Sequence, residues 1–204
     1  MEVVAENKTK QKIIDASLIE FAKHGLAGAR VDRIAEDAGV NKAMIYYHFG
    51  SKESLYMDVI TDHIIQNTSL LRQNISDKES IEDVLDNLVE TYITVFSKSP
   101  YFVNILLREL PNQKSIVIER VAELIGSSEI PQILYQKLSE GIVENKLRPI
   151  NVKQAIVSLI TMNIGFFLMA PIIKRTLNIT DMNEFLAERK TAIVDLFLNG
   201  VKAQ

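Results

Sequence analysis

The chain has 204 residues, of which 47% are hydrophobic and 24% are charged, and its formal net charge is −3. This composition excludes a disordered chain, and the acidic balance argues against a protein that coats nucleic acid without discrimination. The absence of cysteine excludes disulfides, thiolate metal sites and cysteine nucleophiles, and it fits a reducing compartment.

The charges are unevenly distributed along the chain. Residues 1–52 hold eight Lys/Arg and seven Asp/Glu, whereas residues 53–204 hold 15 and 19. A slightly basic head therefore precedes an acidic body, and any attraction to phosphate must come from local placement. The first twelve residues contain acids and no apolar run, so we expect no signal peptide and a cytoplasmic protein.

The N-terminal quarter predicts three helices and the start of a fourth. Residues 8–24 carry an apolar stripe at helical spacing and end at Gly25, a residue type that commonly caps helices. Residues 31–38 have apolar side chains at i, i+3, i+4 and i+7. Residues 42–49 form a third, very short helix, and residues 51–71 contain no helix breaker. This spacing predicts a small helical domain.

The remainder predicts five further helices, at about 80–98, 100–109, 115–146, 151–177 and 182–200. Pro131 falls inside the third of these segments and predicts an interruption or a kink there. No long run alternates with period two, so the fold class is all-α. We expect a DNA-binding domain over residues 1–52 and a helical effector-binding and dimerisation domain over residues 53–204.

Residues 154–173 carry no charge, and this length equals that of a membrane span. The segment also contains Gln154, Asn163 and Pro171, and it lacks aromatic belts and a strong basic bias at its ends. We therefore predict no membrane association. The expected structure is a helix buried in a bundle or at a dimer interface.

The short helix at 42–49 has two unlike faces. Ile45 and Phe49 are four residues apart and share the face that packs on the preceding helices. A rotation of about 100° per residue sends Ala43 and Tyr47 to the opposite side. Two tyrosines and a methionine thus face outward, and this surface is costly to expose unless it contacts a partner.

The turn before this helix agrees with that interpretation. Gly39 is suited to a left-handed conformation at the end of the preceding helix, and Asn41 is a good N-cap. Ser51 is an N-cap candidate for the next helix. Two helices around such a short turn are typical of the helix-turn-helix, which places its second helix in the major groove of DNA.

Residues 25–56, GLAGARVDRIAEDAGVNKAMIYYHFGSKESLY, resemble the N-terminal domain of the tetracycline-repressor (TetR) family of bacterial transcription regulators. The matching positions include IA–AGV at 34–40, the tyrosine at 46, HF at 48–49 and SKE–L at 51–55. The resemblance covers roughly residues 10–56. Beyond them, only length and helical content suit the family.

The resemblance implies a recognition helix at 42–49 and assigns roles to its residues. Positions that approach bases correspond to Lys42, Ala43, Met44 and Tyr47. Positions that hold phosphates correspond to Tyr46, His48 and Lys52. The chain departs from the family at Ala29 and Arg30, where Thr or Ser often caps the supporting helix and touches phosphate. Arg30 is therefore a candidate for a charge-assisted phosphate contact in place of the hydroxyl.

The family also implies a homodimer that binds a palindromic, double-stranded DNA operator and responds to a small-molecule effector. Pairing two recognition helices doubles the sequence readout. Family dimers usually form a four-helix bundle from their two C-terminal helices, and the candidate interface residues here are Ile164, Phe167, Ile193 and Phe197.

Flexible and aromatic side chains in the body suggest an apolar effector pocket, although such a stripe is also typical of a core. The candidate pocket residues are Phe96, Phe102, Leu106, Tyr135, Met162 and Phe166. The polar residues Arg108, Glu109 and Asn163 lie in or beside apolar stretches, where they either orient a ligand or face solvent.

Other function classes have weaker support. The chain has no glycine-rich phosphate loop, no serine elbow and no metal-ligand spacing among its three histidines, so we expect no catalytic residue, metal or cofactor. Two alternatives to a ligand-responsive repressor stay open. One is a helical protein-interaction module with an idle DNA-binding head, and the other is a transcription activator of the same fold.

Overall fold

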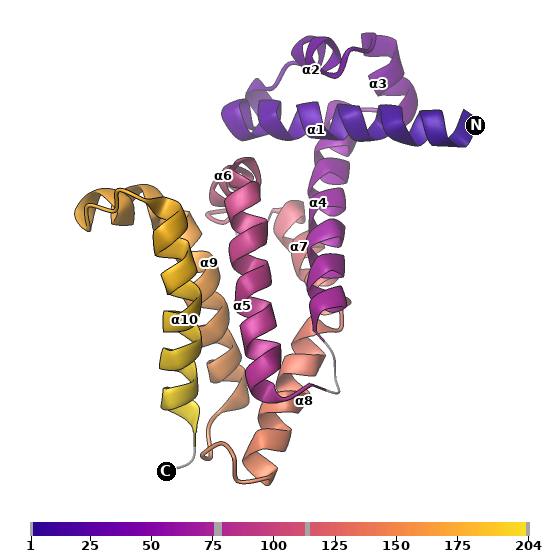
Figure 1. Cartoon of the computed structure of the whole chain (residues 1–204). Helices are drawn as coiled ribbons and strands as arrows, with labels where there is room; N and C mark the ends of the chain where they lie inside the picture. Colours follow the sequence, from indigo (N-terminus) through magenta and orange to yellow (C-terminus); the bar gives the residue numbers. More distant parts are fainter. Residues whose placement is uncertain (1, 76–78, 113–114, 203–204) are drawn as a thin grey trace. The chain divides into compact units, whose positions relative to one another are not determined.

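The computed structural model describes residues 2–75, 79–112 and 115–202, with side chains from residue 6 onward. These residues are almost entirely helical, as expected for the all-α class (Figure 1). Apart from one isolated antiparallel bridge between Leu147 and Lys202, they form no β-structure. The helices are α1 (Glu2–Gly28), α2 (Val31–Ala38), α3 (Lys42–Phe49), α4 (Lys52–Asn74), α5 (Ile81–Lys98), α6 (Pro100–Glu109), α7 (Ile116–Gly126), α8 (Ile130–Val143), α9 (Val152–Thr176) and α10 (Met182–Val201).

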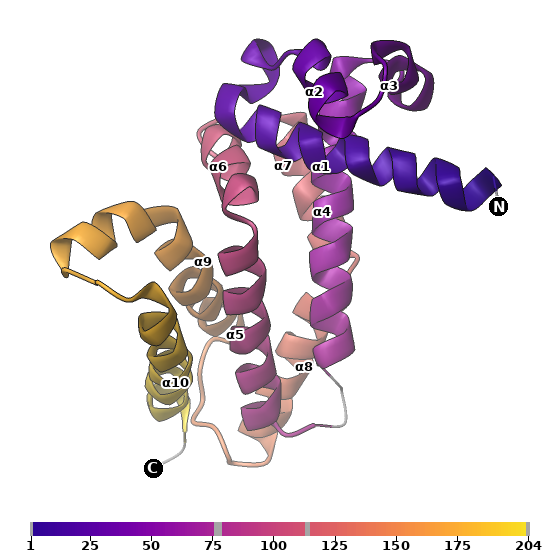
Figure 2. The ribbon, with the colours of Figure 1, turned by 45° about the horizontal axis from the view of Figure 1, so that its top comes forward.

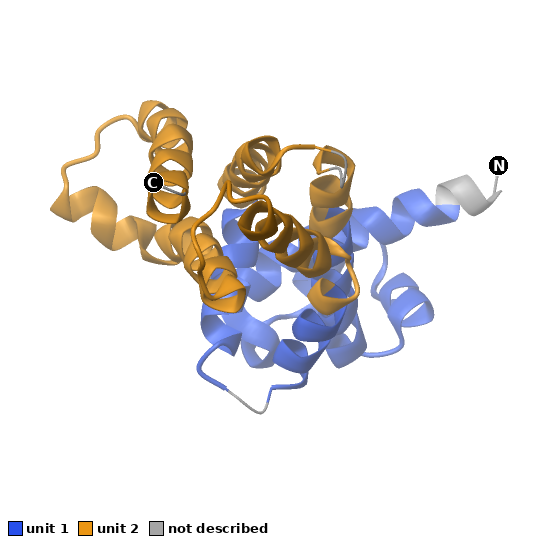
Figure 3. Ribbon diagram, turned by 90° about the horizontal axis from the view of Figure 1, so that it is seen from below, with its two compact units in different colours: residues 1–66, 99–124 blue, residues 67–98, 125–204 orange. Residues whose placement is uncertain are grey.

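The chain packs as two compact units (Figure 3). The head unit comprises residues 1–66 and 99–124, and the body unit comprises residues 67–98 and 125–204. Helices α6 and α7 therefore belong by packing to the head unit. The boundary expected after residue 52 concerns function and stays a prediction.

The head unit is built on α1, with α2 and α3 on one side of it (Figures 1 and 2). Its core contains the fully buried side chains of Phe21, Ile34, Ile45 and Leu55, joined by Phe102 from α6. Burying a side chain of this size stabilises a fold by about 1.5–3 kcal/mol relative to leaving it exposed. This core fixes the faces that α2 and α3 leave to solvent.

Helix α1 is bent. Gly25 has φ 67° and ψ 174° inside the helix, so the chain turns there and makes one more helical turn up to Gly28. The left-handed φ explains the glycine. The predicted end of the helix at Gly25 therefore marks the bend and not the last helical residue.

The body unit packs α5, α8, α9 and α10 around a second core (Figure 1). Its centre contains Leu85, Leu88, Leu134, Leu138 and Phe197. The helix predicted over residues 115–146 is interrupted, as Pro131 indicated. Helix α7 ends at Gly126 and α8 begins at Ile130, with Pro131 in the first turn, where the missing N–H removes no helical hydrogen bond.

Helix α9 differs from the expectation of a buried helix. By length and composition it is the one helix in the described residues that is apolar enough to cross a membrane, yet only 17% of its apolar window is buried. The side chains of Val157, Met169 and Ile172 are each at least half exposed. Burial within the chain is therefore ruled out for most of α9, and the interface interpretation stays open.

Candidate nucleic-acid interface

Helix α3 is held by the local contacts that the sequence predicts. Gly39 has the left-handed φ of 66° and ψ of 35° at the end of α2. The Asn41 side-chain oxygen accepts a hydrogen bond from the Met44 N–H at 2.8 Å, which is an N-cap bond. Ile45 and Phe49 are 1% and 7% exposed and anchor the helix on the head core. These contacts fix which face of α3 is outward.

The outward face of α3 carries aromatic surface. Tyr47 is 79% exposed and Tyr46 is 43% exposed, while Ala43 is exposed and Met44 is half-buried. A small residue at position 43 leaves the backbone of α3 accessible between the larger side chains. The face can therefore approach a grooved surface closely, with tyrosine hydroxyls available for hydrogen bonds.

Lys42, at the start of α3, is bound to an acid of the preceding helix. Its Nζ lies 2.9 Å from Asp32 Oδ1, and both side chains are about half exposed or more. The hydrogen bond from Lys42 lowers the pKa of the Asp32 carboxyl below its ordinary value, and the same bond raises the pKa of Lys42. This pair links α2 to α3 at the surface of the head unit.

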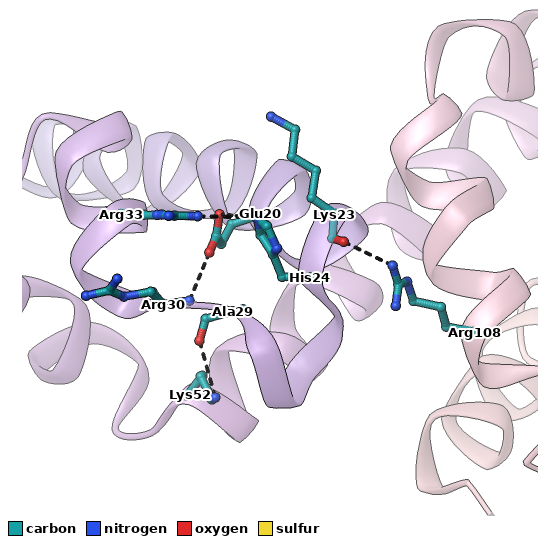
Figure 4. Close-up of polar contacts among 8 residues, drawn as sticks. All are labelled: Glu20, Lys23, His24, Ala29, Arg30, Arg33, Lys52 and Arg108. Atoms are coloured by element: carbon teal, nitrogen blue, oxygen red, sulfur yellow. Dashed lines mark hydrogen bonds and ion pairs between the residues drawn. The ribbon is translucent and has the colours of Figure 1, made fainter.

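A buried carboxylate holds the start of α2 (Figure 4). Glu20 of α1 is 4% exposed, and its Oε1 accepts the Arg30 N–H at 2.9 Å. Arg30 is the N-cap of α2 and gives no side-chain cap of its own. In a capping box, a Glu or Gln three residues after the N-cap accepts this N–H. Here Arg33 occupies that position, and a guanidinium has no acceptor, so Glu20 makes the bond.

Two cations predicted to hold phosphates lie beside the α1–α2 junction. The Lys52 Nζ lies 3.4 Å from the carbonyl oxygens of Ala27 and Ala29, so its ammonium already faces acceptors in the protein. The Arg30 side chain is exposed and points away from Glu20 (Figure 4). Arg30 is thus the freer of the two cations.

The position of the His48 side chain does not suit the phosphate contact that the resemblance implies. Its side chain is 3% exposed, and its Nε2 is buried without a hydrogen-bond partner among the described residues. Its Nδ1 lies 3.8 Å from Glu6 Oε1 of α1. A phosphate contact would require the ring to leave this position. In the observed conformation, His48 supports α3 and does not present a nitrogen to solvent.

Side chains of α6 form hydrogen bonds with α1 and α4 inside the head unit. The Arg108 guanidinium donates to the Lys23 carbonyl oxygen at 3.0 Å, just before the bend in α1 (Figure 4). Glu109 accepts hydrogen bonds from the Tyr56 hydroxyl at 2.8 Å and the Ser115 hydroxyl at 2.6 Å. Burial and these interactions raise the pKa of Tyr56 well above its ordinary value. Arg108 and Glu109 therefore organise the head unit, and neither orients a ligand here.

The six predicted pocket residues are divided between the two units. Phe102 and Leu106 pack in the core of the head unit. In the body unit, Phe96 stacks on Phe167 at 5.4 Å, and Phe166 stacks at 5.4 Å on another phenylalanine. Tyr135 and Met162 are 49% and 37% exposed and lie on different helices. The rings of Phe96 and Phe166 therefore pack on other rings, and the apolar pocket stays a prediction.

The aromatic cluster of the body unit includes a cation. The Arg189 guanidinium lies 4.6 Å from the centre of the Phe166 ring and donates to the Met162 carbonyl at 2.6 Å. Desolvation lowers the pKa of Arg189. Asn163 beside it is 1% exposed and donates to the Leu159 carbonyl at 2.8 Å. These polar groups are therefore built into the packing of α9 against α10.

A polar cavity of about 480 Å³ lies in the body unit, between the last turns of α4 and α5. Thr91 at its wall is 3% exposed and is bonded to Asn74 at 3.1 Å. Two amides, two hydroxyls, one ammonium and one carboxylate make up the polar lining, which comprises Asn74, Asn87, Glu90, Thr91, Thr94 and Lys98, together with Leu70.

Two of the four predicted interface residues lie inside the body unit. Ile193 and Phe197 are 3% and 4% exposed and belong to the core of that unit. Their side chains are therefore not available to a partner subunit. Ile164 and Phe167 are partly exposed on α9. On α10 the neighbouring residue Leu196 is 66% exposed. On α10 an interface would therefore use Leu196 and not the two buried residues.

The sequence interpretation missed Glu20 and Asp32. Glu20 lies on the buried stripe of α1, between Ser17 and Phe21, and a charged residue on such a stripe signals a buried partner. Asp32 gives a weaker signal, since an acid in the first turn of a helix is favoured by the helix dipole alone. Only the structure shows that Asp32 binds Lys42.

Comparison with known proteins identifies similar chains. Residues 13–59 match the family model described as "Bacterial regulatory proteins, tetR family". The HTH-type transcriptional repressor SCO4008 of Streptomyces coelicolor is 39% identical over 82 residues, which are 40% of this chain and 41% of that protein. The HTH-type transcriptional repressor NicS of Pseudomonas putida is 36% identical over 107 residues, 50% of this chain and 49% of that protein. The match thus spans about half the length of these relatives or less.

The fold extends beyond the matching segment. A crystal structure of the transcriptional regulator FadR from Bacillus subtilis, in complex with stearoyl-CoA, superimposes with a TM-score of 0.74. The superposition covers 93% of this chain and 98% of that one, at 19% sequence identity. At this identity the likeness concerns the fold alone.

Proposed function

We propose that the chain is a cytoplasmic, homodimeric transcription regulator that binds a palindromic operator, because residues 13–59 match the model of the tetR family of bacterial regulatory proteins. We further propose that it acts as a repressor, as the names of both matched relatives state for those proteins. An activator of the same fold is the alternative, because promoter geometry decides the direction of the effect.

The observation that carries this proposal is the outward face of α3. A capped, well-anchored helix exposes Tyr47 over 79% of its surface, one turn after the small residue Ala43, and begins with Lys42. We propose that Lys42, Ala43, Met44 and Tyr47 approach bases. Side chains of this kind on a short helix match major-groove readout, where polar groups meet base edges and apolar groups meet thymine methyls.

The remaining DNA contacts are proposed from position and charge. Tyr46, Arg30 and Lys52 would meet phosphates, which position the protein without carrying sequence information. His48 would act through α3, because its side chain is buried against α1.

A gel-shift experiment tests the proposal. The full chain should retard a subset of genomic fragments, with affinity that falls steeply as salt increases. Tyr47→Ala should weaken binding to the selected fragment by about 1–3 kcal/mol and leave the dimer intact. If the chain retards no fragment at low salt, the interaction-module alternative is favoured. If Tyr47→Ala binds the operator normally, the proposed DNA-facing side of α3 is wrong.

We also propose that the effector binds the polar cavity beside Asn74 and Lys98. Its lining suits a small anion rich in hydroxyl groups, because amides and hydroxyls bond such groups and the Lys98 ammonium pairs with the negative charge. The Glu90 carboxylate in the same lining is already paired with Lys190 at 2.8 Å. The FadR relative binds stearoyl-CoA, whose long apolar chain has no counterpart in this lining.

The cavity offers a route to the head unit. Leu70 and Asn74 lie on the last two turns of α4, and the same helix begins directly after α3. A ligand that shifts α4 would change the spacing of the two recognition helices in the dimer. A coupling free energy of about 1–3 kcal/mol suffices to weaken operator binding 5- to 150-fold.

Thermal-shift measurements with hydroxy acids and sugar phosphates check the effector proposal. A stabilising compound should lose its effect in Lys98→Gln and keep it in Lys174→Gln, which removes an exposed ammonium from α9. Equal loss in both variants would contradict binding at the cavity.

A further inference from the structure

The ion pair between Asp32 and Lys42 places a carboxylate on the surface that is proposed to meet DNA. Asp32 Oδ1 lies 2.9 Å from Lys42 Nζ, and the Asp32 side chain is 61% exposed. Arg30 is also close enough to lower the pKa of Asp32. An acid is unfavourable beside a polyanion, so its presence on this surface calls for an explanation.

The ion pair restrains the ammonium of Lys42, the first residue of α3. Lys42 is the first residue of α3 and is 49% exposed, so an unpaired ammonium there would be free to contact any phosphate. With Asp32 in place, such a contact requires the pair to open. It also brings the Asp32 carboxylate close to the DNA backbone. Both effects disfavour binding that rests on phosphates alone.

The exposed pair itself contributes little to folding. Exposed ion pairs typically stabilise proteins weakly and are screened by salt. Asp32 makes its link across two helices, whereas its neighbour Asp37, on the same helix, pairs with no described residue. The arrangement therefore has a larger effect on what Lys42 can bind than on stability.

We propose that Asp32 is a specificity-determining residue that lowers the affinity for non-specific DNA by holding Lys42. This inference rests on the proposed function, because it requires α3 to enter DNA. On the operator, base-edge contacts of α3 compensate for opening the pair, and on other sequences they do not. Discrimination of this kind works by making the wrong complex worse.

The test uses the full-length chain and two duplexes. An operator is first selected from a random duplex library, and fluorescence anisotropy then gives the Kd of the operator and of a scrambled duplex at several salt concentrations. Asp32→Asn should tighten binding to the scrambled duplex about three- to tenfold at low salt. Its salt slope should steepen by about 0.9, the value for one added phosphate contact. The affinity for the operator should increase by a smaller factor, so the ratio of the two affinities falls, by no more than the same three- to tenfold.

Asp37→Asn is the matched control, because it removes the same charge from an exposed position on the same helix. Asp37→Asn should tighten binding to both duplexes by the same factor, so the ratio of the two affinities stays unchanged. Adding Lys42→Gln to Asp32→Asn should return the affinity for scrambled DNA to the level of Lys42→Gln alone. Thermal unfolding of each variant verifies that it is folded.

The outcomes separate this inference from the proposed function. A wild-type chain that selects no sequence from the library would refute the proposed function. A wild-type chain that selects an operator, with Asp32→Asn and Asp37→Asn changing the two affinities alike, would overturn the role of Asp32 only.

Discussion

Helices α3 and α9 both expose large side chains, but in different surroundings. On α3, Tyr47 is exposed on the same short helix as Lys42, whose ammonium pairs with Asp32. On α9, Met169 and Ile172 are 50% and 61% exposed in a segment that has no charge from residue 154 to residue 173. The neighbours of an exposed apolar group indicate its partner. An exposed tyrosine on a helix that also carries a cation is suited to contact DNA. An uncharged apolar stripe is suited to contact another protein surface.

The largest effect is expected on α9 and α10. We expect the dimer interface on the exposed apolar faces of α9 and α10, where Met169→Glu combined with Leu196→Glu should place carboxylates that find no partner. The dimer dissociation constant should rise about 100-fold or more, equivalent to ~3 kcal/mol. Analytical ultracentrifugation measures it. Val143→Glu on α8, an 81% exposed position, is the control, and a dimer unaffected by the double variant would place the interface elsewhere.

The next effect concerns the buried cap of α2. Glu20→Ala should lower the free energy of unfolding by about 1.5–3 kcal/mol, because it removes a hydrogen bond to a charged group and leaves the partly buried Arg30 N–H without its acceptor. Adding Arg33→Glu should restore about 1 kcal/mol, since that carboxylate reaches the same N–H from within α2. Urea unfolding at neutral pH gives both values. Failure of the second substitution to restore stability would argue that Glu20 acts by packing alone.

A smaller effect separates two roles of Lys52. Lys52→Ala should weaken binding to operator and scrambled DNA alike, by about 1 kcal/mol, and flatten the salt slope by about 0.9 if its ammonium meets a phosphate. The alternative role is to hold the carbonyls of Ala27 and Ala29. In that case the unfolding free energy falls and the salt slope stays unchanged. Measuring both quantities on one variant decides between the roles.

The smallest effect is a pH dependence of the head unit. His63 lies against Phe102 with ring centres 4.1 Å apart, and burial lowers its pKa while the charge of Asp62 opposes that shift. Below the ordinary histidine pKa of about 6.5, the unfolded chain binds the proton more readily than the folded one. Stability should therefore decline as pH falls below about 6.5.

Urea unfolding at pH 7.5, 6.5 and 5.5 measures this decline. It should be shallower in His63→Leu than in the wild type. Parallel slopes for the two proteins would exclude His63 as the source.

The recognition helix was predictable because its determinants are local. The Gly39 turn, the Asn41 cap and the anchors Ile45 and Phe49 lie within eleven residues, and each has a conformational reason for its type. The Glu20 cap escaped prediction because it acts on Arg30 from another helix. The same limit applies to Asp32, whose partner depends on how α2 and α3 pack.

The body unit was predictable only in outline. Helical spacing gave its elements and the break at Pro131, but rings at the same spacing serve equally in a core or a pocket. Phe96 and Phe166 proved to pack on other rings, while the cavity is lined by amides and hydroxyls that carry no periodic signal. Side-chain packing between distant helices decides such cases.

The cap at Glu20 has a consequence for building chimeric regulators with new operator preferences. A graft of residues 31–49 alone would transfer the reading surface but leave behind the carboxylate that fixes the start of α2. The smallest transferable cassette therefore begins in α1, before Glu20, and a recipient scaffold must also supply an arginine equivalent to Arg108 for the bend at Gly25. A chimera that keeps both the Glu20–Arg30 and the Arg108–Lys23 hydrogen bonds should retain the sequence preference of the transferred head unit.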